Sequence, residues 1–199
     1  MTTGTKMPHL QPPPIDLRSV CSNIVPSDRL AIVNDGSIHG ARLVAKTPFR
    51  RGELILPLIG KLTARSYRTI QIDVSKHLDG ALIAFMNHSC RPTSVVQAQA
   101  LGVLASVELK AADEVTFFYP STEWGMVRPF DCLCGAPDCI GFVAGAHFLP
   151  LYILSRYFIN PHIRSLVATA LSQCHPIGRK IDNSSANRAP TKGSCPTLY

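Results

Sequence analysis

The sequence predicts a mostly β domain built from many short strands, with a cysteine-rich loop and two helices toward its C-terminal end. Three patterns predict it: short apolar runs separated by turn residues, three cysteines crowded into residues 132–139, and apolar residues at helical spacing after residue 150. The 199 residues suit one domain, and a hydrophobic content of 46% against a charged content of 17% predicts a sizeable buried core.

The first half of the domain is predicted as short strands with tight turns between them. Residues 30–33 form an apolar run that ends at the turn-forming triplet Asn-Asp-Gly. Residues 42–45 and 54–56 follow as further strands, separated by Arg51-Gly52 and closed by Pro57. No ten-residue helical period occurs among these segments, which favours β structure throughout this part of the chain.

The second half continues the β pattern up to residue 119. Residues 95–107 give two β-rich arms around Gly102, which predicts a hairpin, and 110–113 predicts a turn. Residues 115–119 combine β-branched and aromatic side chains, which suits a strand that Pro120 ends. Only residues 81–86 fit a helical turn or two.

The last third of the chain changes to a helical pattern. Leu151, Leu154 and Phe158 recur at helical spacing. Asn160 then offers an N-cap and Pro161 a first helical position, which predicts the start of a second helix. Its apolar side would carry Ile163, Leu166, Val167, Ala170 and Leu171. We expect both helices to pack on the β domain.

The charge and hydropathy of the sequence indicate which binding partners and which cellular location to expect. The formal net charge is +7, from 20 basic and 13 acidic residues, yet Lys and Arg form only pairs such as 50–51 and 179–180. Nucleic-acid binding normally needs several phosphate contacts from one face, so we expect no dedicated nucleic-acid module. The longest apolar run, 54–59, is too short to span a bilayer, and no secretory signal is visible. An intracellular protein, nuclear or cytoplasmic, is expected.

The cysteine loop is the strongest chemical signal in the chain. Cys132, Cys134 and Cys139 stand close together with Gly135 and Pro137 supplying bends. Zinc takes four tetrahedral ligands, often thiolates, so a fourth ligand must come from elsewhere. The remaining cysteines are 21, 90, 174 and 195; Cys90 is the best candidate because it lies in a second motif-like segment, 87–90. The alternative is a set of buried or incidental cysteines.

Several segments, taken in order, resemble the SET domain family with its post-SET zinc motif. The run Asn-His-Ser-Cys-Arg-Pro at 87–92 resembles the family's Asn-His-Ser-Cys-x-Pro signature, and 114–119 resembles the strand that ends in the family's catalytic tyrosine. The cysteine loop resembles the post-SET spacing. Residues 39–45 with Arg51-Gly52-Glu53 resemble the N-terminal strand pair, and Ile72-Asp73 also fits. The resemblance covers about residues 30–143, and motifs in order are more specific than any one alone.

The resemblance implies an S-adenosylmethionine-dependent protein-lysine methyltransferase. The implied fold is a stack of several small β-sheets with a knot-like crossing and a post-SET zinc loop. Tyr119 would be catalytic, and Cys90 would complete a structural site for one Zn²⁺ with Cys132, Cys134 and Cys139. The implied contacts to S-adenosylmethionine are His39, Gly40, Ala41, Arg42, Asn87, His88 and Tyr119. The implied partner is a protein substrate that offers a lysine side chain.

The chemistry of methyl transfer explains why such residues would be needed. The attacking amine must be neutral, although free lysine has a pKa of about 10.4. A narrow, water-poor channel lowers that pKa by penalising charge, and a tyrosine hydroxyl can orient the amine. The alternative for Tyr119 is a strand-end residue with its hydroxyl in solvent, and for Asn87 and His88 a simple polar turn.

Two other functions stay open at the level of sequence. A catalytically degenerate SET scaffold with a binding or regulatory role is favoured by Arg42 and Phe118, where the family often has glycine and aspartate; Thr93 also replaces a usual asparagine. A small-molecule or accessory methyltransferase in a biosynthetic pathway is favoured by the short segment between the two SET halves, about 62–80, where the family has its substrate-selecting insert.

The expected organisation has five parts. Residues 1–29 would be a flexible N-terminal arm, 30–120 the SET domain, and 121–147 the post-SET zinc-binding segment. Residues 148–175 would form the C-terminal helical segment, and 176–199 a disordered tail.

Overall fold

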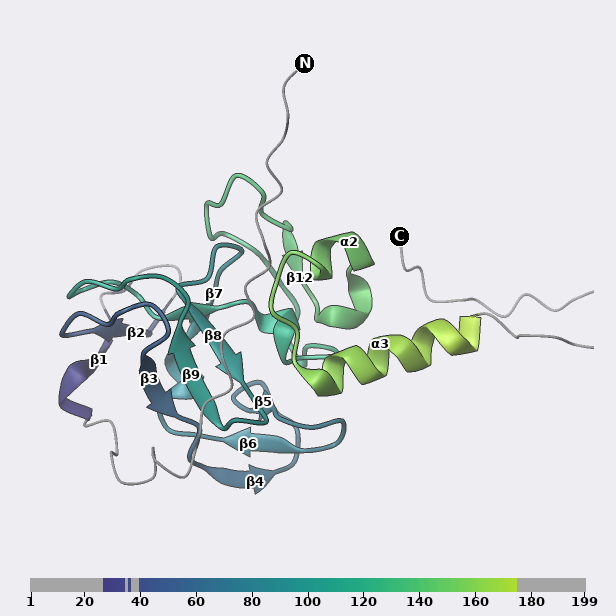
Figure 1. Ribbon diagram of the computed structural model, residues 1–199, viewed down its shortest axis with the longest axis horizontal. Helices are drawn as coiled ribbons and strands as arrows, with labels where there is room; N and C mark the ends of the chain where they lie inside the picture. The colour runs from purple at the N-terminus through teal and green to yellow at the C-terminus, as the bar shows by residue number, and fades with distance from the viewer. Residues whose placement is uncertain (1–26, 35, 37–39, 175–199) are drawn as a thin grey trace, which may run out of the picture.

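The computed structural model describes residues 27–34, 36 and 40–174 (Figure 1). Within this range the strands form five small sheets, as the sequence predicts. The strands are β1 (Leu30–Val33), β2 (Arg42–Ala45), β3 (Leu54–Pro57), β4 (Lys61–Thr63), β5 (Ile70–Gln71), β6 (His77–Asp79), β7 (Asn87–His88), β8 (Ser94–Gln97), β9 (Gly102–Ala105), β10 (Thr116–Phe117), β11 (Phe130–Asp131) and β12 (Phe142–Val143).

Strands β1 to β6, β8 and β9 form three antiparallel sheets. β1 and β2 form an antiparallel pair, which confirms the strands predicted at 30–33 and 42–45. β3, β9 and β8 form a three-stranded sheet, and β4, β6 and β5 form another. The 3-10 helix η1 (Ser27–Arg29) precedes β1. The rest of the expected N-terminal arm, and the expected tail at 176–199, lie outside the described residues.

The predicted hairpin at 95–107 exists, but its turn lies elsewhere. β8 and β9 pair antiparallel, and the chain reverses over 98–101, so Gly102 is the first residue of β9 and not the turn. Leu101 takes the turn's left-handed conformation with φ 47°. A glycine suits β9 because a Cβ at position 102 would lie 3.0 Å from the Leu54 side chain on the neighbouring strand.

A parallel strand pair joins two distant segments at the centre of the domain. β7 pairs with β10, with Asn87 opposite Thr116 and His88 opposite Phe117. Parallel strands need a crossover connection, and here the whole β8–β9 hairpin lies between them in sequence. The strand predicted at 115–119 is therefore shorter than expected. Tyr119 opens the 3-10 helix η3 (Tyr119–Ser121) because Pro120 cannot donate to a strand ladder.

The helices lie at the C-terminal end of the described chain (Figure 1). The helical turn predicted at 81–86 is the 3-10 helix η2 (Ile83–Phe85), and a further one, η4 (Ala146–Phe148), precedes α2 (Leu151–Leu154). The α2 helix ends before Phe158, so the predicted spacing from 151 to 158 does not form one continuous helix. The α3 helix (Pro161–Cys174) begins at the predicted proline.

Asn160 precedes α3 as predicted, but its side chain forms other bonds than those of an N-cap. Its Oδ1 accepts a hydrogen bond from the Ala98 amide at 2.9 Å. Its Nδ2 donates to the carbonyls of Val96 and Ser121, both at 2.9 Å. The side chain is fully buried, so it fastens the start of α3 to the end of β8.

Two apolar clusters hold the elements together. The larger lies among the sheets and includes Leu43, Phe49, Ile55 and Val103. The smaller comprises Phe118, Ala146, Leu149, Leu154, Ile159 and Ile163, so a residue directly before Tyr119 packs with the C-terminal helices. Burial of such side chains is the main favourable term in folding. No helix among the described residues is long and apolar enough to cross a membrane.

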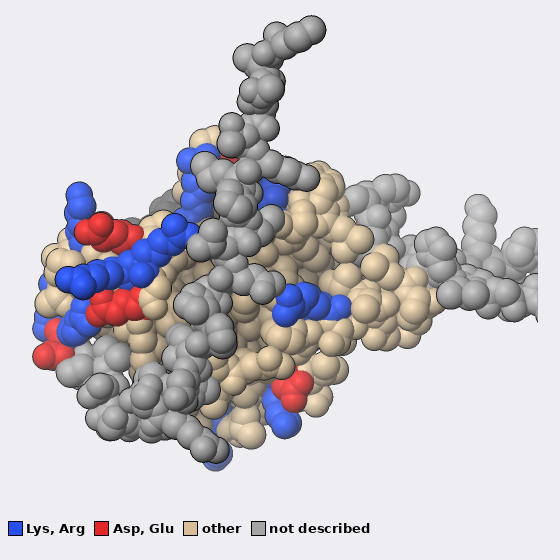
Figure 2. Space-filling view, in the orientation of Figure 1, with Lys and Arg blue, Asp and Glu red and all other residues tan. Residues whose placement is uncertain are grey.

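Charged side chains of both signs gather at the end of the molecule that carries β1 to β3 (Figure 2). The Arg29 guanidinium lies 2.7 Å from the Glu53 carboxylate there and stacks over the Phe49 ring. The end that carries α3 shows few charges on this face (Figure 2).

Candidate functional site

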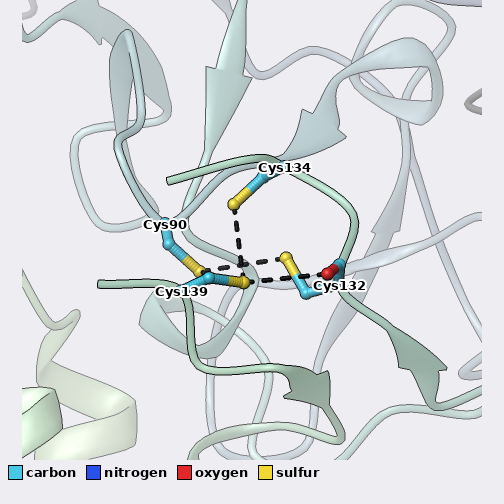
Figure 3. Close-up of side chains that lie close together, drawn as sticks. All are labelled: Cys90, Cys132, Cys134 and Cys139. Carbon is cyan, nitrogen blue, oxygen red and sulfur yellow. Dashed lines mark hydrogen bonds between the residues drawn. The ribbon is translucent and has the colours of Figure 1, made fainter. Parts of the chain in front are cut away.

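Four cysteine sulfurs from two distant segments meet in one cluster (Figure 3). Cys90 follows β7, and Cys132, Cys134 and Cys139 lie in the loop between β11 and β12. The sulfur of Cys90 lies 3.9 Å from those of Cys132 and Cys139, and Cys134 lies 3.8 Å from Cys139. All four sulfurs fall within 4.8 Å of one another. The loop therefore meets the fourth cysteine expected from sequence.

The spacing of the sulfurs fits a tetrahedral metal site. Four thiolates at about 2.3 Å from a central zinc ion stand about 3.8 Å apart along the edges of the tetrahedron. The measured separations match that edge. Backbone amides also point at the sulfurs: Ile140 donates to Cys90, and Gly141 to Cys139, both at 3.4 Å. Such donors stabilise thiolate charge.

Local backbone geometry brings the loop cysteines together. Gly135 and Gly141 have φ of 70° and 75°, a conformation that glycine adopts without steric cost. The Cys132 amide donates to the Gly141 carbonyl at 2.7 Å and closes the loop at its base. Burial raises the pKa of Cys90, so a thiolate there calls for a nearby cation.

His88 joins the cysteine cluster to Tyr119. The Tyr119 amide donates to His88 Nδ1 at 3.2 Å, so the hydrogen of the neutral ring sits on Nε2, which lies 3.4 Å from the Cys90 sulfur. Burial lowers the pKa of His88 to about 4, which keeps the ring neutral. Both ring nitrogens are thus engaged, and the ring packs edge-on against Tyr119 and Phe130. A simple polar turn does not describe this residue.

The Tyr119 hydroxyl points inward. It donates to the Met86 carbonyl at 2.7 Å, and burial raises its pKa, so the hydroxyl keeps its proton at neutral pH. The strand-end alternative, with the hydroxyl in solvent, is therefore wrong. Asn87 lies one strand position from His88 and donates from Nδ2 to Glu114 Oε1 at 2.8 Å.

The expected first cofactor loop reaches this site only in part. His39 lies outside the described residues. Gly40 has φ 68°, and the space where a Cβ would stand is open. Arg42 lies in β2 and, unlike Gly40, does not have positive φ, so that position does not require glycine. β2 approaches the site through Val44, which forms a β-bridge with Glu114, the partner of Asn87.

The departures from the family pattern have structural roles here. Thr93 Oγ1 donates to the Glu114 carbonyl at 2.7 Å and accepts from the Thr116 amide at 2.9 Å, which ties the signature segment to β10. Phe118 is buried and stacks on Tyr157, with ring centroids 3.6 Å apart and planes 5° from parallel. The Tyr157 hydroxyl in turn donates to the Cys90 carbonyl at 2.9 Å.

A small cavity of about 60 Å³ opens beside Tyr119. Its wall includes Ile70, Met86 and Phe117, which are apolar, together with the carboxylate-bearing Glu123. Sequence reasoning did not single out Glu123. The available signal was an acidic residue four positions after the expected catalytic tyrosine, which carries no distinctive motif.

Comparisons with known proteins show what part of this chain is similar to. The SET domain family model matches residues 40–120. "Methyltransferase flvH" of Aspergillus flavus is 44% identical over 88 residues, which cover 43% of this chain and 49% of that protein. An H3 lysine-36 specific histone-lysine N-methyltransferase of Aspergillus oryzae is 34% identical over 80 residues, 37% of this chain and 8% of that protein. The plant histone-lysine N-methyltransferase ASHH1 of Arabidopsis thaliana is 29% identical over 131 residues, 53% and 26% of the two chains.

Two solved structures are also similar to part of this chain. The crystal structure of KRYPTONITE in complex with mCHG DNA and SAH has a TM-score of 0.48 and 20% identity, covering 57% of this chain and 28% of that one. The methyltransferase domain of human histone-lysine N-methyltransferase SETMAR has a TM-score of 0.48 and 15% identity, covering 58% of each chain. The family match carries the comparison: residues 40–120 of this chain match the SET domain model. The matched region spans about half or less of the curated relatives.

Proposed function

We propose that this chain is an S-adenosylmethionine-dependent methyltransferase that methylates the side-chain amine of a lysine in a protein. The observation that carries the proposal is the inward Tyr119 hydroxyl on the wall of a narrow cavity, in a SET domain. A tyrosine at the end of an apolar channel can orient an amine and keep water from it.

The cofactor would lie where β7, β10 and the start of β2 approach one another. Gly40 has open space beside its Cα, so its backbone can come close to a ligand. We propose Gly40, Ala41 and Arg42 as contacts on one side, with His39 beside them in sequence. Asn87, His88 and Tyr119 would supply the other side. Because the His88 ring nitrogens already have partners, its backbone or ring face would make the contact.

The cofactor supplies an electrophilic methyl group on a sulfonium, which a neutral amine attacks as the carbon–sulfur bond breaks. The residues of this chain would do the positioning. The Tyr119 amide and hydroxyl are held by His88 and by the Met86 carbonyl, so the ring has little freedom. A fixed ring limits the cost of ordering the site during the reaction.

The names of the relatives support methyl transfer as the reaction more strongly than they support any one methyl acceptor. Several are named as histone-lysine methyltransferases, which favours a protein substrate and an intracellular location for this chain. The relative from Aspergillus flavus is named only as a methyltransferase. The short segment at about 62–80, where the family has its substrate-selecting insert, favours a small molecule as the second candidate substrate.

We also propose that the four cysteines hold one structural zinc ion. The donor set is four thiol groups within 4.8 Å of one another, and three of their sulfur–sulfur separations, at 3.8 to 3.9 Å, match the edge of a tetrahedron around zinc. Cys90 lies two residues after His88, which contacts Tyr119, so an ion there would fix the loop beside the reactive site.

The function is tested with purified chain and S-adenosylmethionine carrying a labelled methyl group. Histone H3, a cell extract and a panel of small alkylamines are the acceptors. We expect label on a protein lysine in the wild type and its loss in Tyr119→Phe. Label only on small amines would establish the second candidate. Absence of any transfer, together with calorimetric binding of S-adenosylhomocysteine, would favour a non-catalytic scaffold over both.

A further inference from the structure

Glu123 is a carboxylate buried in the wall of the Tyr119 cavity. Only 8% of the residue is exposed. Its Oε1 accepts a hydrogen bond from the Gln71 amide at 2.6 Å and one from Thr122 Oγ1 at 3.5 Å. Within the described part of the chain, no basic side chain lies within ion-pair distance of it. The positive charge of Arg65 lowers the pKa of Glu123, but less than burial raises it.

A buried carboxylate without a cation is costly. Transfer of a charge from water into an apolar interior is unfavourable unless an opposite charge or several hydrogen bonds compensate it. Here burial raises the pKa of Glu123 to about 7, and the hydrogen bond from Gln71 opposes this only in part. A positively charged group that entered the cavity would supply the missing compensation.

The cavity has the chemistry to admit such a group. Its wall is formed in part by Ile70, Met86 and Phe117, which suit a hydrocarbon chain. Its polar lining residues include Glu123 and Tyr119, together with Ser66, Arg68 and Thr69. The Glu123 amide donates to the Tyr119 carbonyl at 3.0 Å, so a single turn of chain carries both groups. A slim alkylammonium matches this combination: an apolar stem with one charged end.

We infer that Glu123 binds the ammonium group of the substrate amine and accepts its proton. The inference rests on the proposed function for the reaction that follows, but not for the binding of the amine. In the proton transfer the N–H bond breaks, an O–H bond forms on the carboxylate, and the electron pair stays on nitrogen. The amine is then neutral, as attack on a methyl group requires. Glu123 is thus a substrate-contacting residue beside Tyr119.

A purely structural carboxyl is the competing explanation. The hydrogen bond from Gln71 links β5 to the segment that follows η3, and a neutral carboxyl or amide could accept it equally well. The two explanations therefore differ in one respect: only amine binding requires the negative charge. Glu123→Gln keeps an acceptor oxygen and removes the charge.

Amine binding is measured without methyl transfer. Met86 and Met126 both line the cavity, so methionine labelled with ¹³C in its methyl group reports on occupancy by NMR. Their signals are assigned with Met86→Leu and Met126→Leu. The full chain is titrated with n-butylamine, which is cationic at neutral pH, and with n-butanol, which has a similar shape and no charge. S-adenosylhomocysteine is present in both series.

We expect n-butylamine to shift both methionine signals in the wild type, and Glu123→Gln to weaken that binding about tenfold or more, since a hydrogen bond between charged groups is lost. Binding of n-butanol should be equally weak in both proteins. Glu108→Gln, which removes a charge from an exposed residue outside the cavity, is the matched control and should bind as the wild type does. Equal n-butylamine binding by wild type and Glu123→Gln would overturn the inference.

A second measurement on the wild type stands even if Glu123→Gln does not fold. The amine keeps its charge between pH 5.5 and 8 because alkylammonium groups titrate near the lysine value of about 10.4. Glu123 changes from mostly protonated to mostly ionised over that range, because burial raises its pKa to about 7. Binding should strengthen about tenfold between these pH values. Binding that stays constant would contradict the inference.

Methyl transfer separates this inference from the proposed function. With an active substrate, kcat/KM of the wild type should rise to a plateau above about pH 7, and Glu123→Gln should lose about 10²-fold and keep rising toward the pKa of the free amine. A variant with unchanged kcat/KM and pH profile would refute the role of Glu123. Amine binding that depends on Glu123 in a chain that methylates nothing would instead refute the proposed function alone.

Discussion

At the scale of single residues, two side chains in the site each contact two other parts of the chain. His88 accepts from the Tyr119 amide and contacts the Cys90 sulfur, so the expected metal cluster and the expected catalytic tyrosine share one ring. Glu123 similarly ties β5 to the segment that follows η3 while facing the cavity. Because these residues contact one another, the effects of substituting two of them on the free energy of unfolding should not be additive.

Removal of the Tyr119 hydroxyl should reduce catalysis far more than stability. Tyr119→Phe loses one hydrogen bond to the Met86 carbonyl, worth about 1 kcal/mol of unfolding free energy. Methyl transfer should fall by about 10²-fold because the amine loses its orienting group. Urea denaturation and single-turnover transfer measure the two effects. Tyr152→Phe, at an exposed position, is the control and should change neither.

The raised pKa of Glu123 predicts a pH-dependent stability. The folded state holds this proton up to about pH 7, whereas an unfolded glutamate releases it near 4.5, so folded Glu123 costs progressively more stability as the pH rises between these values. Glu123→Gln has no such cost. Its unfolding free energy relative to the wild type should rise by about 2 kcal/mol from pH 5.5 to pH 8. A difference that is constant with pH would show that the carboxyl has an ordinary pKa.

At the scale of elements, the C-terminal segment is joined to the SET domain by a few buried contacts. Phe118, between β10 and η3, stacks on Tyr157, which follows α2. Asn160 binds both the end of β8 and the Ser121 carbonyl. These contacts explain why the aspartate usual in the family is absent here: an aromatic ring at position 118 completes the smaller apolar cluster.

Restoration of the family's aspartate should therefore destabilise this chain. Phe118→Asp places a carboxylate in a buried position, removes the ring stacking, and should cost about 4 kcal/mol. Thermal unfolding and limited proteolysis of the α2–α3 segment would reveal it. Phe148→Asp, at an exposed position, should be nearly neutral. If Phe118→Asp is as stable as the wild type, the stacking has no energetic importance.

Asn160 should contribute as much to the free energy of unfolding as a large apolar side chain in the core. Asn160→Ala leaves the Ala98 amide and the Val96 carbonyl without their partner, and we expect a loss of about 3 kcal/mol in urea denaturation. Asn34→Ala, at an exposed position, is the matched control. Equal losses in the two variants would show that the three bonds contribute little.

At the scale of the whole molecule, the proposed zinc ion would connect segments that are far apart in sequence. The contact between Cys90 and Cys139 spans 49 residues, and that between Tyr157 and Cys90 spans 67. A cross-link over such distances restricts the unfolded chain and can add substantially to stability.

Metal removal should therefore affect the entire fold. We expect one zinc ion per chain by mass spectrometry, and a fall of about 10 °C or more in the unfolding temperature after chelation. Cys90→Ser and Cys134→Ser should bind less zinc and unfold at lower temperature. Cys195→Ser, which leaves all four of these cysteines in place, is the control. A native chain without zinc, with an unchanged unfolding temperature, would contradict the metal site.

Chemistry that depends on neighbours in sequence could be predicted well. The cysteine loop with its glycines, the signature at 87–92, the strands at 30–33 and 42–45 and the start of α3 at Pro161 all follow from turn propensity, ligand spacing or backbone restriction within a few residues. Cys90 as the partner of that loop was predicted as well, because motif order limits the choices. The metal itself and the role of Tyr119 stay predictions.

Features that depend on burial could not be predicted from the sequence and are seen only in the structure. Asn160 uses its side chain for the sheet, Phe118 belongs to the helical cluster, and Glu123 lies in the cavity. Each is set by a segment distant in sequence, as with Gln71 and Glu123, which lie 52 residues apart. Local patterns encode backbone conformation and ligand spacing, whereas the cost of a buried charge or an unpaired amide depends on what packs around it.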